Sequence, residues 1–576
     1  MRDRLRWVYE VYRLNHRGVL LALGAAVLAA LAELAAIALY YPVFALLTGT
    51  SPGGGLGARL LGIGRALLGD EPRLVSVLGA LVALLCARAG FLALSRVVSN
   101  HYEMAFNRQL KTRFLERFTG ATWDFIIRTH PGSLHNLFSS YTTAASRGLF
   151  YLVELAIGVV ACLGYLAFAI YTSPALAVFV VLAALVMAPI LRTLYWRMKH
   201  LVERNIGLQD ELRGKFVEYL RGFKTFKGMS LERFYLHELD RDLDDFTRNE
   251  RASYRIQASL QALGEPLFAV VGAAFLLGAH YAFAVPLETI VIFLVLLTRM
   301  YGRLNEVQLN LGKLVRTAPE IRTCNEFEAA ALAAAEPAGG RRIDGRMTLL
   351  ELQDVDLSYP DGTRVLTAVS LRLPVERGLI AIVGPSGIGK STLLDVLSGL
   401  LPPSAGHYRI NGIDVGELDI RALRARVGFI PQAPVLFTRS ILENVSLRPP
   451  GETDRARVEA VARMADAHGF VTRLANGYDT VMGDRGAALS LGQIQRISIA
   501  RALYQQPEIL FCDEPTSALD ARAASEVMRV ITRLAERYPV LLVSHNDDVV
   551  SRAALHVVLD GRGVRLVERA PAEVAR

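Results

Sequence analysis

The sequence predicts an all-α transmembrane domain of six helices followed by an α/β nucleotide-binding domain. Six apolar runs crowd into the first half of the 576-residue chain, and each approaches the ~20 residues that a helix needs to cross a bilayer core. In the second half, an apolar run at 379–383 breaks into a glycine-rich stretch at 384–392 and then resumes with helical periodicity. A strand, a glycine-rich loop and a helix in this order are typical of a phosphate-binding α/β domain.

The apolar runs also predict how the chain crosses the membrane. They comprise residues 18–48, 73–99, 146–172, 174–195, 258–282 and 286–303. The connections near 172–174 and 282–286 are short and lack Lys and Arg, whereas 100–145 and 196–257 are long and arginine-rich. Because cytoplasmic loops carry the excess of Lys and Arg, we expect a multi-pass protein of the cell (inner) membrane. Both termini, the long loops and the nucleotide-binding domain then lie in the cytoplasm.

Four segments follow from these patterns. Residues 1–17 alternate arginines with apolar and aromatic residues at helical spacing, which predicts an amphipathic elbow helix lying on the inner membrane face. We expect the transmembrane domain to occupy 18–310. Residues 311–346 turn polar and then rich in alanine and glycine, so they are interpreted as a linker whose first half continues the sixth helix. The nucleotide-binding domain is expected at 347–576.

Composition limits the partners that the chain can have. It is 52% hydrophobic with a net charge of +9, yet no polybasic stretch interleaved with aromatic residues points to nucleic acid. The excess arginine is better explained by loops that flank membrane spans, so we expect membrane lipids as neighbours and no nucleic acid. The four cysteines lack metal-ligand spacing and are expected to be free thiols that behave as small hydrophobic residues.

Glu33, Arg88, Glu154 and Glu265 are ionisable residues within the apolar spans. A charge at membrane depth is costly unless it is paired or hydrated, so such residues usually face the interior of a helix bundle. Glu33, Arg88 and Glu265 are candidates for a substrate cavity. The alternative is a structural ion pair, for example between Glu33 and Arg88, and the sequence leaves both interpretations open. For Glu154 we favour a structural role.

The glycine-rich stretch predicts how phosphate is bound. It comprises Gly384, Pro385, Ser386, Gly387, Ile388, Gly389, Lys390, Ser391 and Thr392. Its glycines let backbone N–H groups turn toward one centre, and the following helix adds its positive N-terminus. Lys390 can reach the β- and γ-phosphates of ATP, and the Ser391 hydroxyl is placed to hold Mg²⁺. An ordinary glycine-rich turn would not explain a lysine and a hydroxyl at these positions.

Two carboxylates end a second apolar run. Residues 509–512 predict a buried parallel strand, which delivers Asp513 and Glu514 at its carboxyl end, where α/β sheets bind their ligands. Asp513 is a candidate Mg²⁺ ligand acting through water. Glu514 is the candidate base that polarises the attacking water.

Between these two motifs lies Leu489-Ser490-Leu491-Gly492-Gln493, which resembles the signature of ATP-binding cassette (ABC) proteins. Further segments agree with this resemblance: 429–432 is similar to the Q-loop, 517–520 to the D-loop, and 542–545 to the segment of the switch histidine. The resemblance covers residues 347–576 and implies roles for several side chains. These are Gln432 at Mg²⁺ and in catalysis, His545 in catalysis, Tyr359 stacking on adenine, and Ser490, Gly492, Gln493 and Asp520 at the nucleotide.

This sequence departs from the family pattern at two positions. Leu491 replaces the first signature glycine, although the serine hydroxyl and the glycine N–H that the family places at the γ-phosphate of the opposite subunit both remain. Asp484 stands where many exporters carry Glu, with the charge retained. We expect Leu491 to tune the approach of the two subunits and not to abolish it.

Six spans with two long cytoplasmic extensions resemble the exporter class of ABC proteins. The resemblance implies coupling helices, expected near 122–133 and 205–215, although ordinary solvated helix connections would give the same pattern. The run 32–43, together with Arg88, is also similar in layout to lipid-linked oligosaccharide flippases.

One membrane unit and one cassette cannot close an ABC site alone, so the resemblance implies a homodimer with two ATP sites that works by alternating access. The expected function is ATP-driven export or flipping of an amphipathic substrate: a peptide, a lipid-linked sugar or a hydrophobic small molecule. A soluble ABC ATPase would lack the spans. An ATP-hydrolysing membrane sensor without a transported substrate remains the alternative.

Overall fold

The computed structural model describes residues 2–48, 73–129, 131–172, 174–281, 287–358, 363–482, 489–544, 551–560 and 563–568. They form two compact units, which we treat separately. The first comprises residues 1–120 and 129–333, and the second comprises 121–128 and 334–576.

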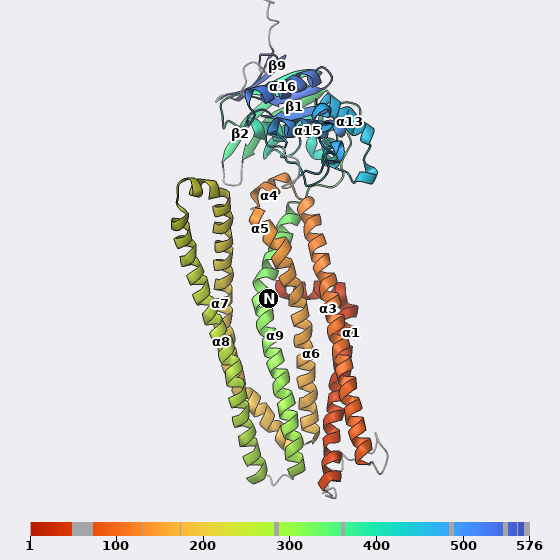
Figure 1. The fold of residues 1–576 in the computed structure, drawn as a ribbon, viewed down its shortest axis with the longest axis vertical. Coiled ribbons are helices and arrows are strands. Elements are labelled where there is room, and N and C mark those ends of the chain that lie inside the picture. Colours follow the sequence, from red (N-terminus) through yellow and green to blue (C-terminus); the bar gives the residue numbers. More distant parts are fainter. Residues whose placement is uncertain are drawn as a thin grey trace, which may run out of the picture. The chain divides into compact units, whose positions relative to one another are not determined.

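The first unit is entirely helical in its described residues, which confirms the predicted fold class. Its long helices are α1 (Arg2–Thr48), α3 (Leu74–Thr119), α6 (Thr142–Thr172), α7 (Pro174–Gly228), α8 (Glu232–Tyr281) and α9 (Leu287–Ala333). The short α5 (Pro131–Asn136) and the π-helix η1 (Leu137–Tyr141) lead directly into α6. Helix α1 packs on α3, α6 on α9, and α7 on α8 (Figure 1).

Three described segments are long and apolar enough to cross a membrane: Arg17–Phe44, Leu74–Thr119 and Gly132–Tyr171. Small residues let the helices approach closely. Alanines along α1, among them Ala22 and Ala26, are buried, and the Ser95 hydroxyl of α3 donates to the Ala22 carbonyl at 2.9 Å. A methyl group at Gly158 of α6 would meet Val307 Cγ2 of α9 at 2.5 Å. Close backbone approach of this kind is typical of helix packing in membranes.

The structure corrects one expectation for the long extensions. Residues 2–17, where an elbow helix is expected, are helical and belong to α1, which continues to Thr48. The coupling helix predicted near 205–215 is wrong, because α7 passes through this range and the chain reverses only at 229–231. Past Gly214, Tyr219 and Phe226 of α7 pack against Tyr235 of α8. In the other range, 122–133, the structure places the short helix α4 (Trp123–Arg128).

The second unit contains two sheets. The antiparallel sheet has the order β2-β1-β4-β5, and the larger sheet has the order β10-β9-β3-β8-β7-β6. The strands of the first are β1 (Leu349–Ser358), β2 (Arg364–Pro374), β4 (Ala405–Ile410) and β5 (Ile413–Asp414). Those of the second are β3 (Gly378–Val383), β6 (Val427–Ile430), β7 (Ile509–Asp513), β8 (Pro539–Val543), β9 (Leu555–Asp560) and β10 (Gly563–Glu568).

Parallel pairing of β3, β6, β7, β8 and β9 brings their carboxyl ends to one edge. The strands are largely apolar: Ala381 and Ile382 of β3, and Leu541 and Leu542 of β8, are fully buried. Such runs are typical of parallel strands that are covered on both faces. Around them lie α10 (Lys390–Leu397), α11 (Ile420–Arg424), α12 (Ile441–Ser446), α13 (Arg455–Met464), α14 (His468–Val471), α15 (Leu491–Tyr504) and α16 (Ala521–Ala535). The α/β prediction for this unit is confirmed.

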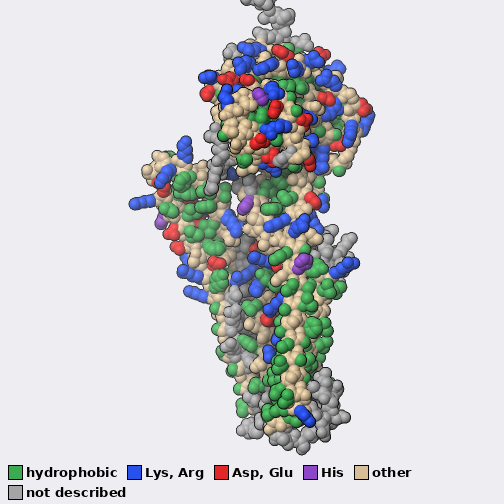
Figure 2. Space-filling view, turned by 45° about the vertical axis from the view of Figure 1, so that its right-hand side comes forward, with side chains coloured by type: hydrophobic (Ala, Val, Ile, Leu, Met, Phe, Trp, Pro, Cys, Tyr) green, Lys and Arg blue, Asp and Glu red, His purple; other side chains and the backbone are tan. Residues whose placement is uncertain are grey.

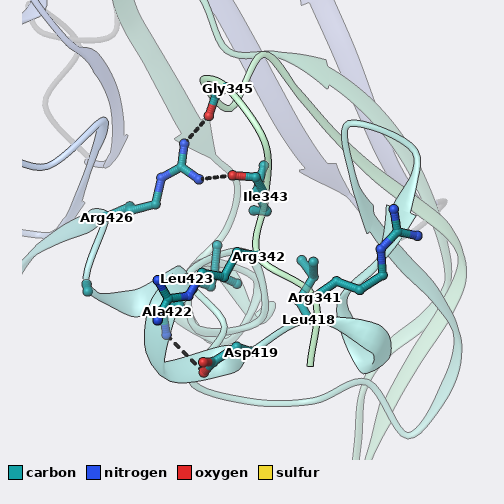
Figure 3. Close-up of a pocket in the computed structure, with 10 residues that line it drawn as sticks. Arg341, Arg342, Ile343, Gly345, Leu418, Asp419, Ala422, Leu423 and Arg426 are labelled. Carbon is teal, nitrogen blue, oxygen red and sulfur yellow. Dashed lines mark hydrogen bonds between the residues drawn. The ribbon is translucent and has the colours of Figure 1, made fainter. Parts of the chain in front are cut away.

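The start of the second unit is tied to its sheet. Arg426 donates to the Ile343 carbonyl at 2.7 Å and also reaches the Gly345 carbonyl (Figure 3). The same guanidinium pairs with Glu508 at 2.6 Å. These residues border a cavity of about 480 Å³ between the segment 341–345 and α11. The contacts of Arg426 hold this segment on the domain.

Candidate nucleotide-binding site

The phosphate-binding loop leaves the carboxyl end of β3 and enters α10. Gly389 takes a left-handed conformation (φ 102°) at the N-cap of α10, and a Cβ there would meet Val365 Cγ1 at 2.7 Å. A Cβ at Gly384 would meet the Leu559 carbonyl oxygen at 2.5 Å. Only glycine satisfies both the backbone and the space at Gly389. The predicted loop 384–392 is therefore a tight turn whose N–H groups lie at a helix N-terminus.

Lys390 is folded back into this loop. Its ammonium donates to the Gly384 and Pro385 carbonyls, each at 2.9 Å, and the residue is 5% exposed. An ammonium so close to the glycine-rich turn is positioned to exchange carbonyl oxygens for phosphate oxygens, which carry more charge.

Ser391 and Asp513 come together although 122 positions separate them. The Ser391 hydroxyl donates to Asp513 Oδ1 at 2.8 Å. This contact arises because β3 and β7 flank β8 in the same parallel sheet. Burial raises the pKa of Asp513 above its ordinary value, while the hydrogen bond from Ser391 opposes that shift.

Glu514 follows directly and faces a different partner. Gln432 Nε2 donates to Glu514 Oε2 and to Ser517 Oγ, both at 3.2 Å. Glu514 itself has a left-handed backbone conformation (φ 39°), which is strained for a residue with a side chain. Its N–H donates to the Val543 carbonyl at 3.1 Å, and this bond helps to hold the unusual conformation. The two successive carboxylates therefore have different partners: Asp513 accepts from Ser391, and Glu514 accepts from Gln432.

The segment 489–493 caps helix α15. The Ser490 hydroxyl accepts from the Gln493 N–H, and the Gln493 side chain accepts from the Ser490 N–H, forming a capping box. A Cβ at Gly492 would meet Ala523 Cβ at 2.9 Å. Leu491, the departure from the family signature, keeps 42% of its surface exposed at the start of the helix. The signature hydroxyl is thus part of a rigid, accessible helix end.

Of the remaining site residues predicted from the sequence, some have contacts in the structure and others lie outside the described residues. Asp520 caps α16, because its side chain accepts from the Ala523 N–H at 2.7 Å. Tyr359, Asp484 and His545 lie outside the described residues. Glu265 is in the backbone of α8, but its side chain is not described.

Two residues near the site were missed by sequence reasoning. Ser517 receives the Gln432 hydrogen bond, and its place within the D-loop segment was an available signal. Asp395 is half-buried on α10, and burial together with the charge of Asp513 raises its pKa to about 6. A lone Asp on a helix gave no sequence signal, because only the fold shows that it faces Asp513.

The raised pKa of Asp395 predicts a pH-dependent stability. A carboxyl whose pKa is higher in the folded state than in the unfolded state favours folding when protonated, so stability falls as pH rises from about 4 through about 6. We expect Asp395→Asn to stabilise the protein at pH 7.5 by of the order of 1 kcal/mol, allowing for partial solvent screening, and to change little near pH 4.

The measurement is thermal unfolding of the purified protein at the two pH values with EDTA and without nucleotide. The exposed Glu376→Gln is the matched control and should shift the midpoint at neither pH. An Asp395→Asn gain of equal size at both pH values would contradict the assignment.

The donor set of this site fits Mg²⁺. Mg²⁺ prefers oxygen ligands and is commonly held by one or two carboxylates together with substrate phosphates. The Ser391 hydroxyl and the Asp513 carboxylate supply adjoining oxygens next to the phosphate loop. Within the part of the chain that the structure describes, no group of three or more His, Cys, Asp or Glu side chains could form an all-protein metal cage.

The charges of the membrane spans form a cluster in the first unit. Glu33 is 2% exposed, and Arg88 Nε lies 2.9 Å from its Oε2. Arg299 and Arg303 of α9 approach the same carboxylate at 3.7 Å each. The ion pair between Glu33 and Arg88 that the sequence left open is therefore present, and two further arginines that were not anticipated join it.

A phosphate-binding loop, a carboxylate-ended strand and apolar helices define a membrane protein with a nucleotide-binding α/β domain. Comparison with known proteins makes this more specific. The profile described as "ABC transporter transmembrane region" matches residues 19–304, and that described as "ABC transporter" matches residues 366–517. The chain belongs to the ABC transporter family.

The chain is also similar to ABC transporters in sequence and to a solved ABC exporter in fold. The chain is 29% identical over 376 residues to an uncharacterized ABC transporter ATP-binding protein, y4gM, of Sinorhizobium fredii, covering 64% of this chain and 63% of that protein. It is 38% identical over 224 residues to ABC transporter B family member 1 of Dictyostelium discoideum, covering 39% of this chain and 24% of that protein. The matches thus span less than two thirds of these relatives' lengths. The fold is similar to that of a bacterial Atm1-family ABC exporter with ATP bound, with a TM-score of 0.78, 22% identity and 96% of each chain covered.

Proposed function

We propose that this protein is an ATPase that drives export or flipping of an amphipathic substrate across the cell membrane. The observation that carries the proposal is the arrangement of Lys390, Ser391, Asp513 and Glu514 around one phosphate-binding loop, in a chain that also has apolar spanning helices. Transport coupled to ATP hydrolysis is the function that uses both the nucleotide site and the spanning helices.

In the hydrolysis step, the backbone of 384–389 and the N-terminus of α10 bind the phosphates of ATP. Lys390 leaves its two carbonyl acceptors for the β- and γ-phosphates. Ser391 and Asp513 would hold Mg²⁺, which would neutralise developing charge on the phosphates. Glu514 accepts a proton from the attacking water, and the Gln432 amide, already 3.2 Å from Glu514 Oε2, orients that carboxylate. We assign Tyr359 to adenine, and His545 to the γ-phosphate.

A homodimer is part of the proposal, because one chain carries one phosphate loop and one signature segment. Closing a site requires the Ser490 hydroxyl and the Gly492 N–H of the second copy. The exposed start of α15 at Leu491 supports this, and we place Gln493 and Asp520 at the same contact.

The end of the α7–α8 hairpin gives further support for a dimer. Large apolar side chains there are exposed: Phe216, Leu220, Phe223, Met229, Phe234 and Leu236. Figure 2 shows hydrophobic side chains gathered around this hairpin end. In the proposed topology the hairpin end stands outside the bilayer, so an apolar patch of this kind marks a protein-binding surface. A second copy of the chain is the partner that the proposal supplies.

The test is transport by the purified protein in proteoliposomes with ATP supplied on the side of the nucleotide-binding domain. Fluorescent peptides, lipid-linked sugars and hydrophobic small molecules form the panel. We expect ATP-dependent movement of one class, and none with a non-hydrolysable analogue. ATP hydrolysis without movement of any class would overturn the transport proposal and favour a membrane sensor.

A further inference from the structure

The charges that meet around Glu33 do not cancel. Arg88 of α3 and Arg299 and Arg303 of α9 surround Glu33 of α1, and the second carboxylate of the group is Glu306, 2.8 Å from Arg303. Three guanidiniums therefore share two carboxylates. The Tyr165 hydroxyl of α6 lies beside Glu33 and Arg303 and adds no negative charge. Among the described residues, this cluster carries one uncompensated positive charge.

The next charges along the helices do not remove the excess. Glu154 of α6 is within the electrostatic influence of Arg96, Arg303 and Lys313, which favour its charged form, and of the Glu306 carboxylate, which disfavours it. Adding Glu154 together with Arg96 and Lys313 to the cluster raises the excess from one positive charge to two. Figure 2 likewise shows basic side chains among the hydrophobic ones on the visible face of the helical unit.

The depth of these residues in the membrane makes the excess positive charge costly in free energy. Arg299 and Arg303 lie roughly 18 and 24 Å along α9 from Leu287, taking 1.5 Å per residue, which in a spanning helix is the depth of the hydrocarbon core. An ionised side chain at this depth faces the bundle interior or a water-filled cavity, because lipid cannot solvate it. The excess charge therefore calls for an anion that the described residues do not provide.

Of the three arginines around Glu33, Arg299 is best placed to bind that anion. Arg303 keeps 10% of its side chain exposed and is held between two carboxylates, whereas Arg299 keeps 41% exposed. The carboxylate nearest to Arg299 lies 3.7 Å from its Nε, which is beyond a good charge-assisted hydrogen bond. Its planar guanidinium can donate two parallel hydrogen bonds to a phosphate or carboxylate.

We propose that Arg299, supported by Arg88 and Arg303, binds the anionic headgroup of an amphiphile, a phosphate or a carboxylate, inside the membrane domain. This inference rests on the proposed function and narrows its substrate class from amphipathic to anionic amphipathic. Glu33 lies between the three guanidiniums and offsets their mutual repulsion.

The test measures binding without ATP, so that it is independent of transport. Radiolabelled dodecyl phosphate is titrated onto the full-length protein in phosphatidylcholine nanodiscs, with empty nanodiscs subtracted. Dodecanoate, dodecyltrimethylammonium and inorganic phosphate are run as competitors. We expect saturable binding that dodecanoate displaces and the cationic amphiphile does not. Equal displacement by dodecyltrimethylammonium would overturn the proposal, and inorganic phosphate competing as well as dodecanoate would overturn its assignment to an amphiphile.

Substitutions in α9 test whether dodecyl phosphate binds at Arg299. Arg299→Gln should weaken dodecyl phosphate binding about tenfold or more, the loss expected for one charged hydrogen-bonding group, while Arg299→Lys should retain most of it. Arg322→Gln is the matched control, since Arg322 lies on the same helix in an exposed pair with Glu326 and should bind as the parent does. Thermal unfolding of each variant checks that it is folded.

Unchanged affinity in a folded Arg299→Gln protein overturns the proposal, and would be expected if a carboxylate of a second copy neutralised Arg299 instead. Headgroup binding that depends on Arg299 in a protein that transports nothing would overturn the proposed function and support this inference. The experiments therefore distinguish failure of the headgroup inference from failure of the proposed transport function.

Discussion

Glu514→Gln is expected to reduce ATP turnover by roughly 10²- to 10⁴-fold while leaving ATP binding intact, the range for loss of a general base. The amide has the shape of the carboxylate and can still accept the hydrogen bond from Gln432, which lies 3.2 Å away. Its oxygen cannot take the proton of the attacking water. The measurement is steady-state phosphate release together with nucleotide affinity, in protein reconstituted in lipid.

A control variant and a mixing experiment accompany this measurement. Glu536→Gln removes an exposed carboxylate at the end of α16 and should leave turnover unchanged. Mixing wild-type and Glu514→Gln chains before assembly tests the dimer, because mixed dimers with one defective site should make activity fall faster than the wild-type fraction. Full turnover by Glu514→Gln would remove this residue from the catalytic assignment, and a linear mixing curve would argue against coupled sites.

Glu33→Gln is expected to destabilise the membrane domain strongly, by about 3 to 5 kcal/mol, the cost of removing one partner of a buried ion pair. Glu33 is almost fully buried and is the only described carboxylate within 4 Å of Arg88 or Arg299. Its loss leaves both guanidiniums without their counter-charge. Thermal unfolding in detergent, followed by size-exclusion chromatography, measures the effect.

A double substitution identifies the cause. Glu33→Gln combined with Arg88→Gln removes both members of the closest pair and should unfold at a higher temperature than Glu33→Gln alone. Glu326→Gln, which breaks an exposed pair on α9, should have little effect, because exposed ion pairs contribute little. If Glu33→Gln unfolds at the wild-type temperature, the cluster is not a buried charge network.

The elements of the candidate nucleotide site could be recognised in the sequence because they are short and contiguous. A glycine-rich turn must contain its glycines in one run, and a strand that ends in carboxylates reads as apolar residues followed by Asp513 and Glu514. The sequence assigned both Ser391 and Asp513 to Mg²⁺, with Asp513 at the carboxyl end of a parallel strand, whereas the hydrogen bond between them is seen only in the structure. Asp395 was not predictable, because its importance depends on which neighbour the helix turns it toward.

The long extensions were less predictable. The periodicity of 196–257 marks helix, but it does not show where two helices separate, and a glycine such as Gly214 can lie within a continuous helix when the apolar pattern runs past it. The reversal at 229–231 includes Ser230 in a left-handed conformation, which serine adopts without any distinctive sequence signal.

The class of each domain and the family could be predicted from the sequence alone, because both depend on local patterns of apolarity and on contiguous motifs. Only the tertiary structure decided how the charges at membrane depth combine. Glu33, Arg88 and Arg299 lie on three different helices, and their meeting depends on how α1, α3 and α9 pack. A net charge that belongs to a cluster, and not to any one residue, exists only after the helices have been brought together.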